Sequence, residues 1–325
     1  MRNIAPALVS VRDLAVRFSG EHGVNHAVNG VSFDIPAGKV LGLLGESGSG
    51  KSVTMRALLR ILPERRTTIS GSIRFEGRDV LALTGRDLNR YRGGDLAMIF
   101  QDPGLALDPV FTIGKQIADT VMRHKGVSRT EARARALEML EVVRIPSARA
   151  RLDNYPHEMS GGMRQRAMIA LALSCQPKLL LADEPTTALD ATVQIQILLL
   201  LRDLQQQFGM SAIFVTHDVG VAAEISDDIA VMYAGNIVER GSASAVLKSS
   251  RHPYTQGLLA STIRGDSSGK RLLGIGGAPP DLSRLPEGCA FAPRCAQAIA
   301  ACQSPLPRLD ATSPAHGSAC IKSAS

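Results

Sequence analysis

Three short apolar runs stand out along the chain, and each of them stops at glycine or polar residues. The runs cover residues 40–44 (VLGLL), 179–182 (LLLA) and 212–215 (AIFV). A continuous apolar run of this length is typical of a parallel strand that is buried on both faces. Because ligands bind at the carboxyl ends of such strands, the pattern predicts an α/β sheet with a binding site at the polar strand ends.

The segments around these runs carry other patterns. Residues 8–18 and 28–35 show mixed alternation with glycine breaks, which is typical of antiparallel strands at a sheet edge. The segment from about 102 to 164 favours helices, most clearly at residues 130–143. After residue 241 the composition shifts to serine, proline, glycine and alanine, which indicates an appendage. The predicted division is a core at 1–101 and 165–240, a helical subdomain at 102–164, and a tail at 241–325.

Composition narrows the class of protein. With 325 residues, 45% hydrophobic and 21% charged, the chain can bury one large core and a smaller appendage. No apolar run approaches the roughly 18 residues that cross a bilayer. Arg12 and Asp13 interrupt the start, where a signal peptide needs an apolar stretch. We therefore expect the chain to stay in the cytosol.

The net charge of +7 suits a nucleic acid, an anionic membrane surface, or no more than a basic surface. Aromatic residues make up only 4% of the chain and tryptophan is absent, so there is little material for stacking on nucleic-acid bases. The composition therefore weighs against a nucleic-acid partner.

The first apolar run leads into a segment with an exacting pattern. Residues 45–52 match G-x-x-x-x-G-K-[ST], in the required position between a buried strand and a helical segment, so a chance glycine–serine loop is a poor explanation. The glycines let backbone N–H groups converge on phosphate oxygens, and the helix N-terminus adds a favourable potential. Lys51 would reach the β- and γ-phosphates, and Ser52 would ligate Mg²⁺. The predicted phosphate site comprises Gly45, Glu46, Ser47, Gly48, Ser49, Gly50, Lys51 and Ser52.

Polar residues at the ends of other apolar runs are candidates for the same site. Asp183 and Glu184 follow the second run directly, and a structural helix cap would explain only one of them. In a phosphate-loop protein, Asp183 is suited to hold Mg²⁺ and Glu184 to polarise the attacking water. His217 follows the third run, and Gln101 follows the apolar residues 96–100. Both are candidates to line the phosphate pocket, and Gln101 is also a candidate Mg²⁺ ligand.

A second anion site is predicted at Ser160, Gly161 and Gly162, which precede the helical residues 163–174. The N-terminus of a helix favours an anion. The segment has no lysine and no metal ligand, so it can assist with a nucleotide that is held elsewhere but cannot hold one alone.

In order along the chain, these residues resemble the nucleotide-binding subunits of ABC transporters. The resemblance implies an ABC-type P-loop NTPase core of α/β class with an antiparallel β subdomain, a helical insertion and a small cysteine-containing appendage. Met159 and Met163 depart from the usual leucine and glutamine of the signature motif, while its serine and glycines are retained. The matching elements are Phe18 (adenine stacking), residues 45–52 (Walker A), Gln101 (Q-loop), 159–163 (signature), Asp183-Glu184 (Walker B), Ala188-Leu189-Asp190 (D-loop) and His217 (switch histidine).

The resemblance also implies partners. ATP would lie between the P-loop of one chain and the signature helix of another, with Asp190 near the nucleotide. Residues 159–166 (MSGGMRQR), 101–103 (QDP), 252–255 (HPYT) and the cysteine tail resemble the dipeptide, oligopeptide and nickel importers. That group implies a second, usually different, ATPase chain, two permease subunits and an extracytoplasmic solute-binding protein. The chain would then lie on the cytoplasmic face of the inner membrane. Peptides are the expected cargo, with nickel or another small solute as the alternative.

Three other classes of protein share parts of this pattern. A DNA-repair or chromosome ATPase would carry a coiled coil or zinc modules between Lys51 and Ser160, and neither is evident. A translation ATPase would carry two copies of the nucleotide-binding core in one chain. A purely structural binding module would have no use for Glu184 and His217.

Four cysteines lie in the tail, at Cys289, Cys295, Cys302 and Cys320, among few apolar residues. A cytosolic location argues against disulfides, and clustered cysteines there are more often metal ligands. The spacing C-x5-C-x6-C-x17-C lacks the C-x2-C pairs of common zinc ribbons, whereas four thiolates are what a [4Fe–4S] cluster requires. The resembling importers carry such a cluster, so we expect one here, with zinc or no metal as alternatives. Cys175 is expected to be buried and inert.

Overall fold

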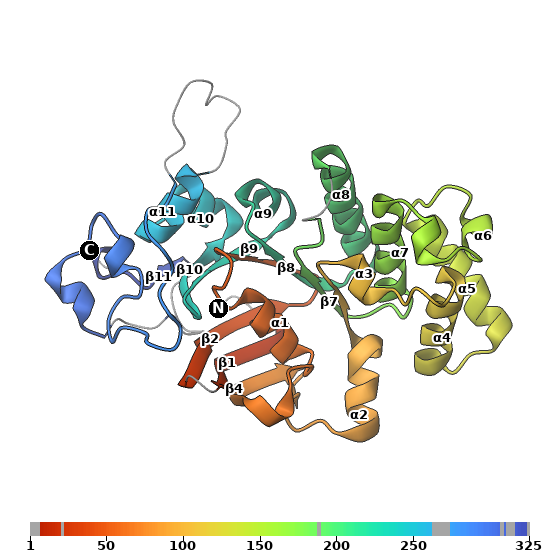
Figure 1. Ribbon diagram of the computed structural model, residues 1–325, viewed down its shortest axis with the longest axis horizontal. Coiled ribbons are helices and arrows are strands. Elements are labelled where there is room, and N and C mark those ends of the chain that lie inside the picture. The colour runs from red at the N-terminus through yellow and green to blue at the C-terminus, as the bar shows by residue number, and fades with distance from the viewer. Residues whose placement is uncertain are drawn as a thin grey trace, which may run out of the picture. The chain divides into compact units, whose positions relative to one another are not determined.

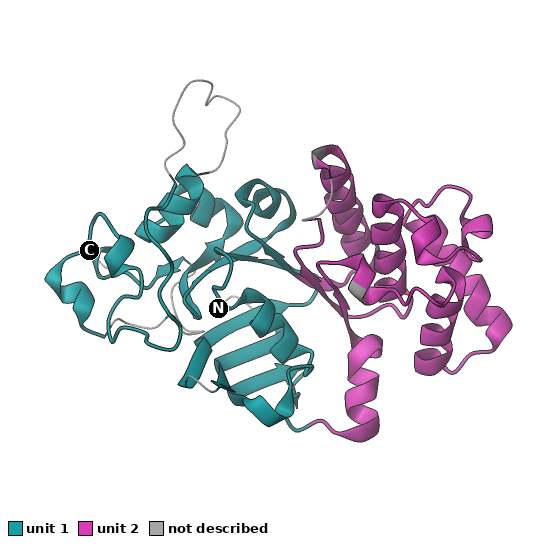
Figure 2. Ribbon diagram, in the orientation of Figure 1, with its two compact units in different colours: residues 1–82, 214–325 teal, residues 83–213 magenta. Residues whose placement is uncertain are grey.

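The computed structural model describes residues 7–20, 23–186, 190–261, 274–305, 309 and 316–323. The chain forms two compact units, Met1–Ala82 with Phe214–Ser325 (unit 1) and Leu83–Ile213 (unit 2), as Figure 2 shows. β8 (Ser211–Thr216) begins in unit 2 and ends in unit 1. The division predicted from composition has other bounds than these units and stays a prediction.

An antiparallel sheet forms the first part of unit 1 (Figure 1). The strands predicted at 8–18 and 28–35 are confirmed as β1 (Ala7–Gly20) and β2 (Gly23–Pro36), although β1 lies between two neighbours and not at the edge. The strand β4 (Thr67–Phe75) is not predicted, because its centre reads Ser-Gly-Ser and only Ile73 and Phe75 are buried in it. The strand order is β2 (Gly23–Pro36), β1 (Ala7–Gly20), β4 (Thr67–Phe75) and β5 (Arg78–Asp79).

A second set of strands in unit 1 surrounds β3 (Val40–Leu44), the strand before the phosphate loop. All five residues of β3 are buried, as its continuous apolar sequence predicted. β9 (Asp228–Tyr233) is parallel to β3, β10 (Asn236–Ser242) is antiparallel to β9, and the short β11 (Gly317–Ser318) is antiparallel to β10. The remaining elements here are α1 (Lys51–Leu58), the 3-10 turn η1 (Glu64–Arg66), α9 (Val219–Ile225), α10 (Ala243–Lys248) and α11 (Pro253–Ala260).

The segment of the tail that follows α11, residues 274–305 and 316–323 (hereafter the tail), packs on the rest of unit 1. Phe291 is buried in one hydrophobic cluster with Tyr233 of β9 and Tyr254 of α11, and the ring centroids of Phe291 and each tyrosine are 5.3 Å apart. Leu282 and Leu285 pack against the same cluster. The tail has few apolar residues of its own, and this shared aromatic cluster supplies a core for it. Its short helical turns are η4 (Ala292–Arg294), η5 (Ala300–Gln303) and η6 (Ile321–Ser323).

Unit 2 combines two buried parallel strands with a group of helices. β6 (Leu96–Ile99) pairs with β7 (Leu179–Asp183), and every residue in both strands is buried. The helix predicted at 130–143 is confirmed as α5, which begins at a capping box between Ser128 and Glu131. The helices are α2 (Gly85–Arg90), η2 (Tyr91–Asp95), α3 (Pro103–Ala106), α4 (Ile113–Lys125), α5 (Arg129–Val142), α6 (Ala148–Arg151), η3 (Pro156–Glu158), α7 (Gly161–Leu173) and α8 (Ala191–Phe208). Among the described residues, no helix combines the length and apolar character needed to span a membrane.

The aromatic cluster yields a stability prediction. Replacing Phe291 with alanine removes a ring that is only 4% exposed, so we expect the free energy of unfolding to fall by about 3–5 kcal/mol. We also expect faster proteolysis within the tail. The matched control is Ile299→Ala in the same tail, because Ile299 is 46% exposed and should change stability by less than about 1 kcal/mol. Equal losses in the two variants, measured by denaturant unfolding, would show that the cluster does not anchor the tail.

Candidate active site

The phosphate loop joins β3 to α1 and needs glycine at two crowded positions. Gly45 has φ 152°, and a Cβ atom there would collide with the carbonyl oxygen of Met232 on β9. Gly50 has φ 103° and caps α1, and a Cβ atom there would collide with the carbonyl oxygen of Ala27 on β2. A side chain at either position would force the loop away from its neighbours. Gly45 and Gly50 are therefore required because the neighbouring strands leave no space for a Cβ atom at these positions.

Lys51 is buried, with 5% of its surface exposed, and its ammonium group turns back over the loop. Nζ donates to the carbonyl oxygens of Gly45 (2.7 Å) and Glu46 (2.9 Å) and to the hydroxyl of Ser49 (3.3 Å). A phosphate oxygen is a stronger acceptor for an ammonium group than these neutral oxygens. Ser52 lies half-buried in the first turn of α1, which contains no acidic residue to repel an anion. The loop is therefore suited to phosphate.

Two further predicted residues belong to unit 1. Phe18 is half-buried on β1, opposite Asn25 of β2 and Thr67 of β4. His217 is exposed and directly follows β8, as predicted for a polar residue at the end of that strand. The next residue, Asp218, caps α9 and accepts from the N–H of Gly220 at 2.7 Å. The cap fixes the chain direction directly after His217.

Gln101 and Glu184, the residue directly after the buried Asp183, meet in unit 2. Asp183 is the last residue of β7 and is only 4% exposed, whereas Glu184 follows with a left-handed φ of 44°. Gln101 comes two residues after the end of the parallel neighbour β6, and its Nε2 donates to Oε2 of Glu184 at 3.4 Å. Glu184 and Gln101, 83 positions apart in sequence, are thus brought into contact as parallel strand ends predict.

The signature segment forms the N-terminus of α7. The hydroxyl of Ser160 caps the helix by accepting from the N–H of Met163 at 3.3 Å, and Ser160 and Gly161 are exposed. Met159 is 4% exposed, so this departure from the usual leucine keeps an apolar side chain in the core. Gln165 of α7 is buried and donates to the carbonyl oxygen of Pro185, which ties the helix to the segment after Glu184.

The D-loop is only partly described. Asp190 is exposed and occupies the position before α8. Ala188 and Leu189 lie outside the described residues.

The four tail cysteines are free and half-buried. The N–H of Cys289 donates to the carbonyl oxygen of Cys302 at 2.8 Å, which brings two of these segments side by side. Burial raises the pKa of the Cys289 thiol, and the thiols of Cys302 and Cys295 raise it further. Within the part of the chain that the structure describes, no three histidine, cysteine or acidic side chains form a group that could hold a metal ion. Cys175 is buried as predicted, and burial raises the pKa of its thiol.

Two residues that contact the phosphate loop are not identified as site residues by the sequence patterns. Arg294 of the tail forms an ion pair with Glu46, and the hydroxyl of Tyr254 accepts from the Glu46 N–H. Tyr254 was noticed only as part of the 252–255 motif, and no local pattern marks Arg294.

Comparison with known proteins identifies the family. Residues 28–187 match the family described as ABC transporter, and residues 238–302 match the oligopeptide/dipeptide transporter C-terminal region. The probable peptide ABC transporter ATP-binding protein y4tR of Sinorhizobium fredii is 50% identical, over 98% of this chain and 96% of that protein. The oligopeptide transport ATP-binding protein OppD of Salmonella typhimurium is 49% identical, over 98% of this chain and 94% of that protein.

Solved structures agree with this result. The ATP-binding cassette MJ0796, a dimer in a post-hydrolysis state with ADP and Pi, is 26% identical and has a TM-score of 0.65, over 72% of this chain and 98% of that chain. The cbiO1 protein of Clostridium perfringens, part of the transporter complex cbiONQ, is 27% identical with a TM-score of 0.64, over 75% of this chain and 91% of that chain. With the phosphate loop and the paired carboxylates in the family's order, the chain belongs to the ATP-hydrolysing subunits of the ABC transporter family.

Proposed function

We propose that this ATPase energises the import of dipeptides or oligopeptides through separate permease subunits. The observation that supports peptides as the cargo is the match of residues 238–302 to the oligopeptide/dipeptide transporter C-terminal region. That segment lies outside the shared ATPase sequence. The relatives named for peptide transport match over nearly the whole chain, which supports the same assignment.

We infer the following roles for the site residues. The N–H groups of the phosphate loop and Lys51 bind the β- and γ-phosphates, and Phe18 stacks on the adenine. Ser52 and Asp183, with Gln101, would hold Mg²⁺, which supplies neutralisation of phosphate charge when it is bound. Glu184 orients the attacking water, and its contact with Gln101 supports this role because the amide can hold the carboxylate in place.

We propose that a second ATPase chain completes each nucleotide site. The exposed Ser160 and Gly161 at the N-terminus of the 13-residue helix α7 would bind the phosphates of a nucleotide on the partner's phosphate loop. Asp190 and His217 would lie near the same nucleotide. Closing of such a pair would drive the permease between its two states, and hydrolysis would reopen it.

We propose that the permease docks on unit 2 beside Gln101. A hollow of about 420 Å³ lies there, lined in part by Gln101, Pro103 and Arg164. The nearby apolar side chains Val110 and Phe111 are 67% and 41% exposed, which suits a protein contact. A transporter of this kind works at the cytoplasmic face of the inner membrane with two permease subunits and an extracytoplasmic solute-binding protein.

Affinity purification of the tagged chain from its own membranes tests this function. We expect permease subunits, a second ATPase chain and a solute-binding protein to co-purify. The recovered solute-binding protein should bind short peptides in calorimetry. Binding of nickel alone would replace the cargo, and recovery of nucleic acid in place of permeases would contradict the transport function.

The role of Glu184 yields a second prediction. Glu184→Gln keeps the size of the side chain but removes the charged base, so ATP turnover should fall by about 10²–10⁴-fold while ATP binding is retained. Lys51→Ala should instead weaken ATP binding, because it removes a charged phosphate contact. The matched control is Glu138→Gln in the same unit, since that exposed carboxylate pairs with Arg135 on the surface of α5. Unchanged turnover in Glu184→Gln, measured in the assembled transporter, would refute the assignment.

We also propose that Cys289, Cys295, Cys302 and Cys320 hold a [4Fe–4S] cluster, with zinc as the alternative. Four cysteine thiolates are the usual ligand set of such a cluster. The backbone hydrogen bond from Cys289 to Cys302 supports the proximity of two of the ligands. The thiols would have to converge further than the structure shows. The cluster would have a structural role, and no substrate redox step is assigned to it.

Metal analysis decides between these possibilities. Anaerobically purified protein should be brown and contain about four irons per chain, as the cluster formula requires. Cys295→Ser and Cys302→Ser should each lose the iron, whereas Cys175→Ser should retain it because that thiol is buried away in unit 2. One tightly held zinc in colourless protein would establish the alternative. A metal-free tail that remains folded would end the metal proposal.

A further inference from the structure

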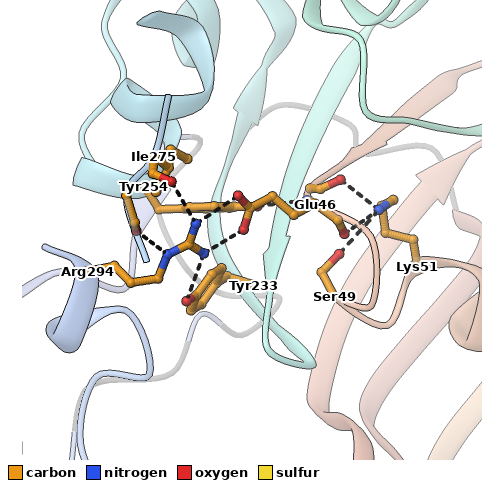
Figure 3. Close-up of polar contacts among 9 residues, drawn as sticks. Glu46, Ser49, Lys51, Tyr233, Tyr254, Ile275 and Arg294 are labelled. Atoms are coloured by element: carbon orange, nitrogen blue, oxygen red, sulfur yellow. Dashed lines mark hydrogen bonds and ion pairs between the residues drawn. The ribbon is translucent and has the colours of Figure 1, made fainter. Parts of the chain in front are cut away.

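Glu46, the second residue of the phosphate loop, is held by three different partners (Figure 3). Its carboxylate accepts from both terminal nitrogens of Arg294, at 2.7 Å to Oε2 and 3.0 Å to Oε1. Its backbone N–H donates to the hydroxyl of Tyr254 at 2.8 Å. Its carbonyl oxygen accepts from Nζ of Lys51 at 2.9 Å. The residue therefore connects the tail and α11 directly to the lysine that the motif assigns to phosphate.

The side chain of Arg294 is itself buried and held by hydrogen bonds. Its side chain is 5% exposed, and its Nε donates to the carbonyl oxygen of Gly276 at 2.8 Å. The terminal nitrogens also donate to the carbonyl oxygen of Ile275 (3.2 Å) and the hydroxyl of Tyr233 (3.3 Å). The guanidinium carbon lies 5.8 Å from the ring centroid of Tyr233. Every nitrogen of the group is engaged, so Glu46 meets a rigid and nearly buried cation.

Tyr254 holds the backbone of the same residue. It is fully buried, and its ring centroid lies 4.6 Å from that of Tyr233. Burial raises the pKa of Tyr254, so its hydroxyl remains neutral. The neutral hydroxyl accepts the hydrogen bond from the Glu46 N–H. The side chain and the backbone of Glu46 are thus anchored independently, one by the tail and one by α11.

The anchoring fixes the backbone of the phosphate loop at Glu46, next to Lys51. Lys51 donates to Gly45 and Glu46, and Glu46 cannot rotate without breaking its contacts with Arg294 and Tyr254. A loop that is already ordered loses less conformational entropy when it binds a ligand, and so it binds more tightly. A bidentate ion pair with a buried guanidinium is strong enough to impose this order.

We propose that Arg294 and Tyr254 are positioning residues for ATP, through which the C-terminal segment pre-organises the phosphate loop. Neither residue is assigned a contact with the nucleotide. Their effect passes through Glu46. The proposal depends on ATP binding at this loop and not on the cargo, the partner chain or a metal in the tail.

The test compares MgATP dissociation constants of the purified chain, measured with a fluorescent ATP analogue. Arg294→Met keeps an unbranched apolar stem but removes the guanidinium group, and we expect a five- to twenty-fold weaker affinity, on the scale where about 1.4 kcal/mol is a tenfold loss. Glu46→Gln should weaken binding similarly, because its amide would face the Arg294 donors with another donor. The Arg294→Met/Glu46→Gln double variant should bind ATP no more weakly than the weaker single variant, because each single change already removes the Arg294–Glu46 ion pair. Tyr254→Phe should also weaken binding, with the ring retained.

The matched control is Arg12→Met, because Arg12 forms an equally bidentate pair with Asp34, at 2.8 Å for both bonds, on an exposed part of unit 1. It should change ATP affinity by less than about two-fold, as expected for a surface pair. In steady-state turnover of the assembled transporter, Arg294→Met should raise KM and leave kcat nearly unchanged, and Arg294→Lys should restore part of the affinity.

Three results would overturn the proposal. The first is a lower melting temperature of Arg294→Met with unchanged ATP affinity, which would show a merely structural pair. The second is additive losses in the double variant. The third is normal ATP affinity in both Glu46→Gln and Tyr254→Phe. These two variants decide the question if Arg294→Met does not fold. Absence of ATP binding in the unmodified chain would instead count against the nucleotide site itself.

Discussion

The phosphate loop is confined at two positions, Gly45 and Gly50, by backbone carbonyl groups that leave no space for a side chain. Gly45 lies against the carbonyl of Met232, Gly50 lies against the carbonyl of Ala27, and the carbonyl of Ser49 accepts from the N–H of Gly235 at 3.0 Å. These neighbours come from β9, from β2 and from the turn after β9. The loop can therefore take this shape only when the antiparallel sheet and the strand pair β3–β9 are both formed. These strands of unit 1 therefore hold the phosphate loop in its shape.

The tail belongs to the same arrangement. It lacks a core of its own, and it obtains one by packing Phe291 between the tyrosines of β9 and α11. Arg294 lies three residues after Phe291 and contacts Glu46, so the packing that orders the tail also positions a residue that holds the loop. A metal is not needed to explain why the tail is folded on unit 1. The proposed cluster would add further order among the cysteines.

Much of this could be predicted from the sequence, because the signals are local. Continuous apolar runs identify β3, β7 and β8, and β9 carries the same signal at residues 229–233, although it was not predicted. β4 could not be recognised from its Ser-Gly-Ser centre, since its place is set by pairing with β1. Gln101 and Glu184 could likewise be identified as polar residues that follow apolar runs, and the carboxyl ends of strands in an α/β sheet are expected to lie along one edge.

The contact between Arg294 and Glu46 could not be predicted in this way. The two residues are 248 positions apart, and their pairing depends on how the tail packs on β9 and α11. A crystal structure of the chain with Mg²⁺ and a non-hydrolysable ATP analogue tests the account most directly. In that structure, Lys51 should leave the carbonyl oxygens of Gly45 and Glu46 for the β- and γ-phosphates, while Glu46 stays bonded to Arg294 and Tyr254. A nucleotide bound elsewhere, or a bound loop in which Glu46 has left both partners, would contradict it.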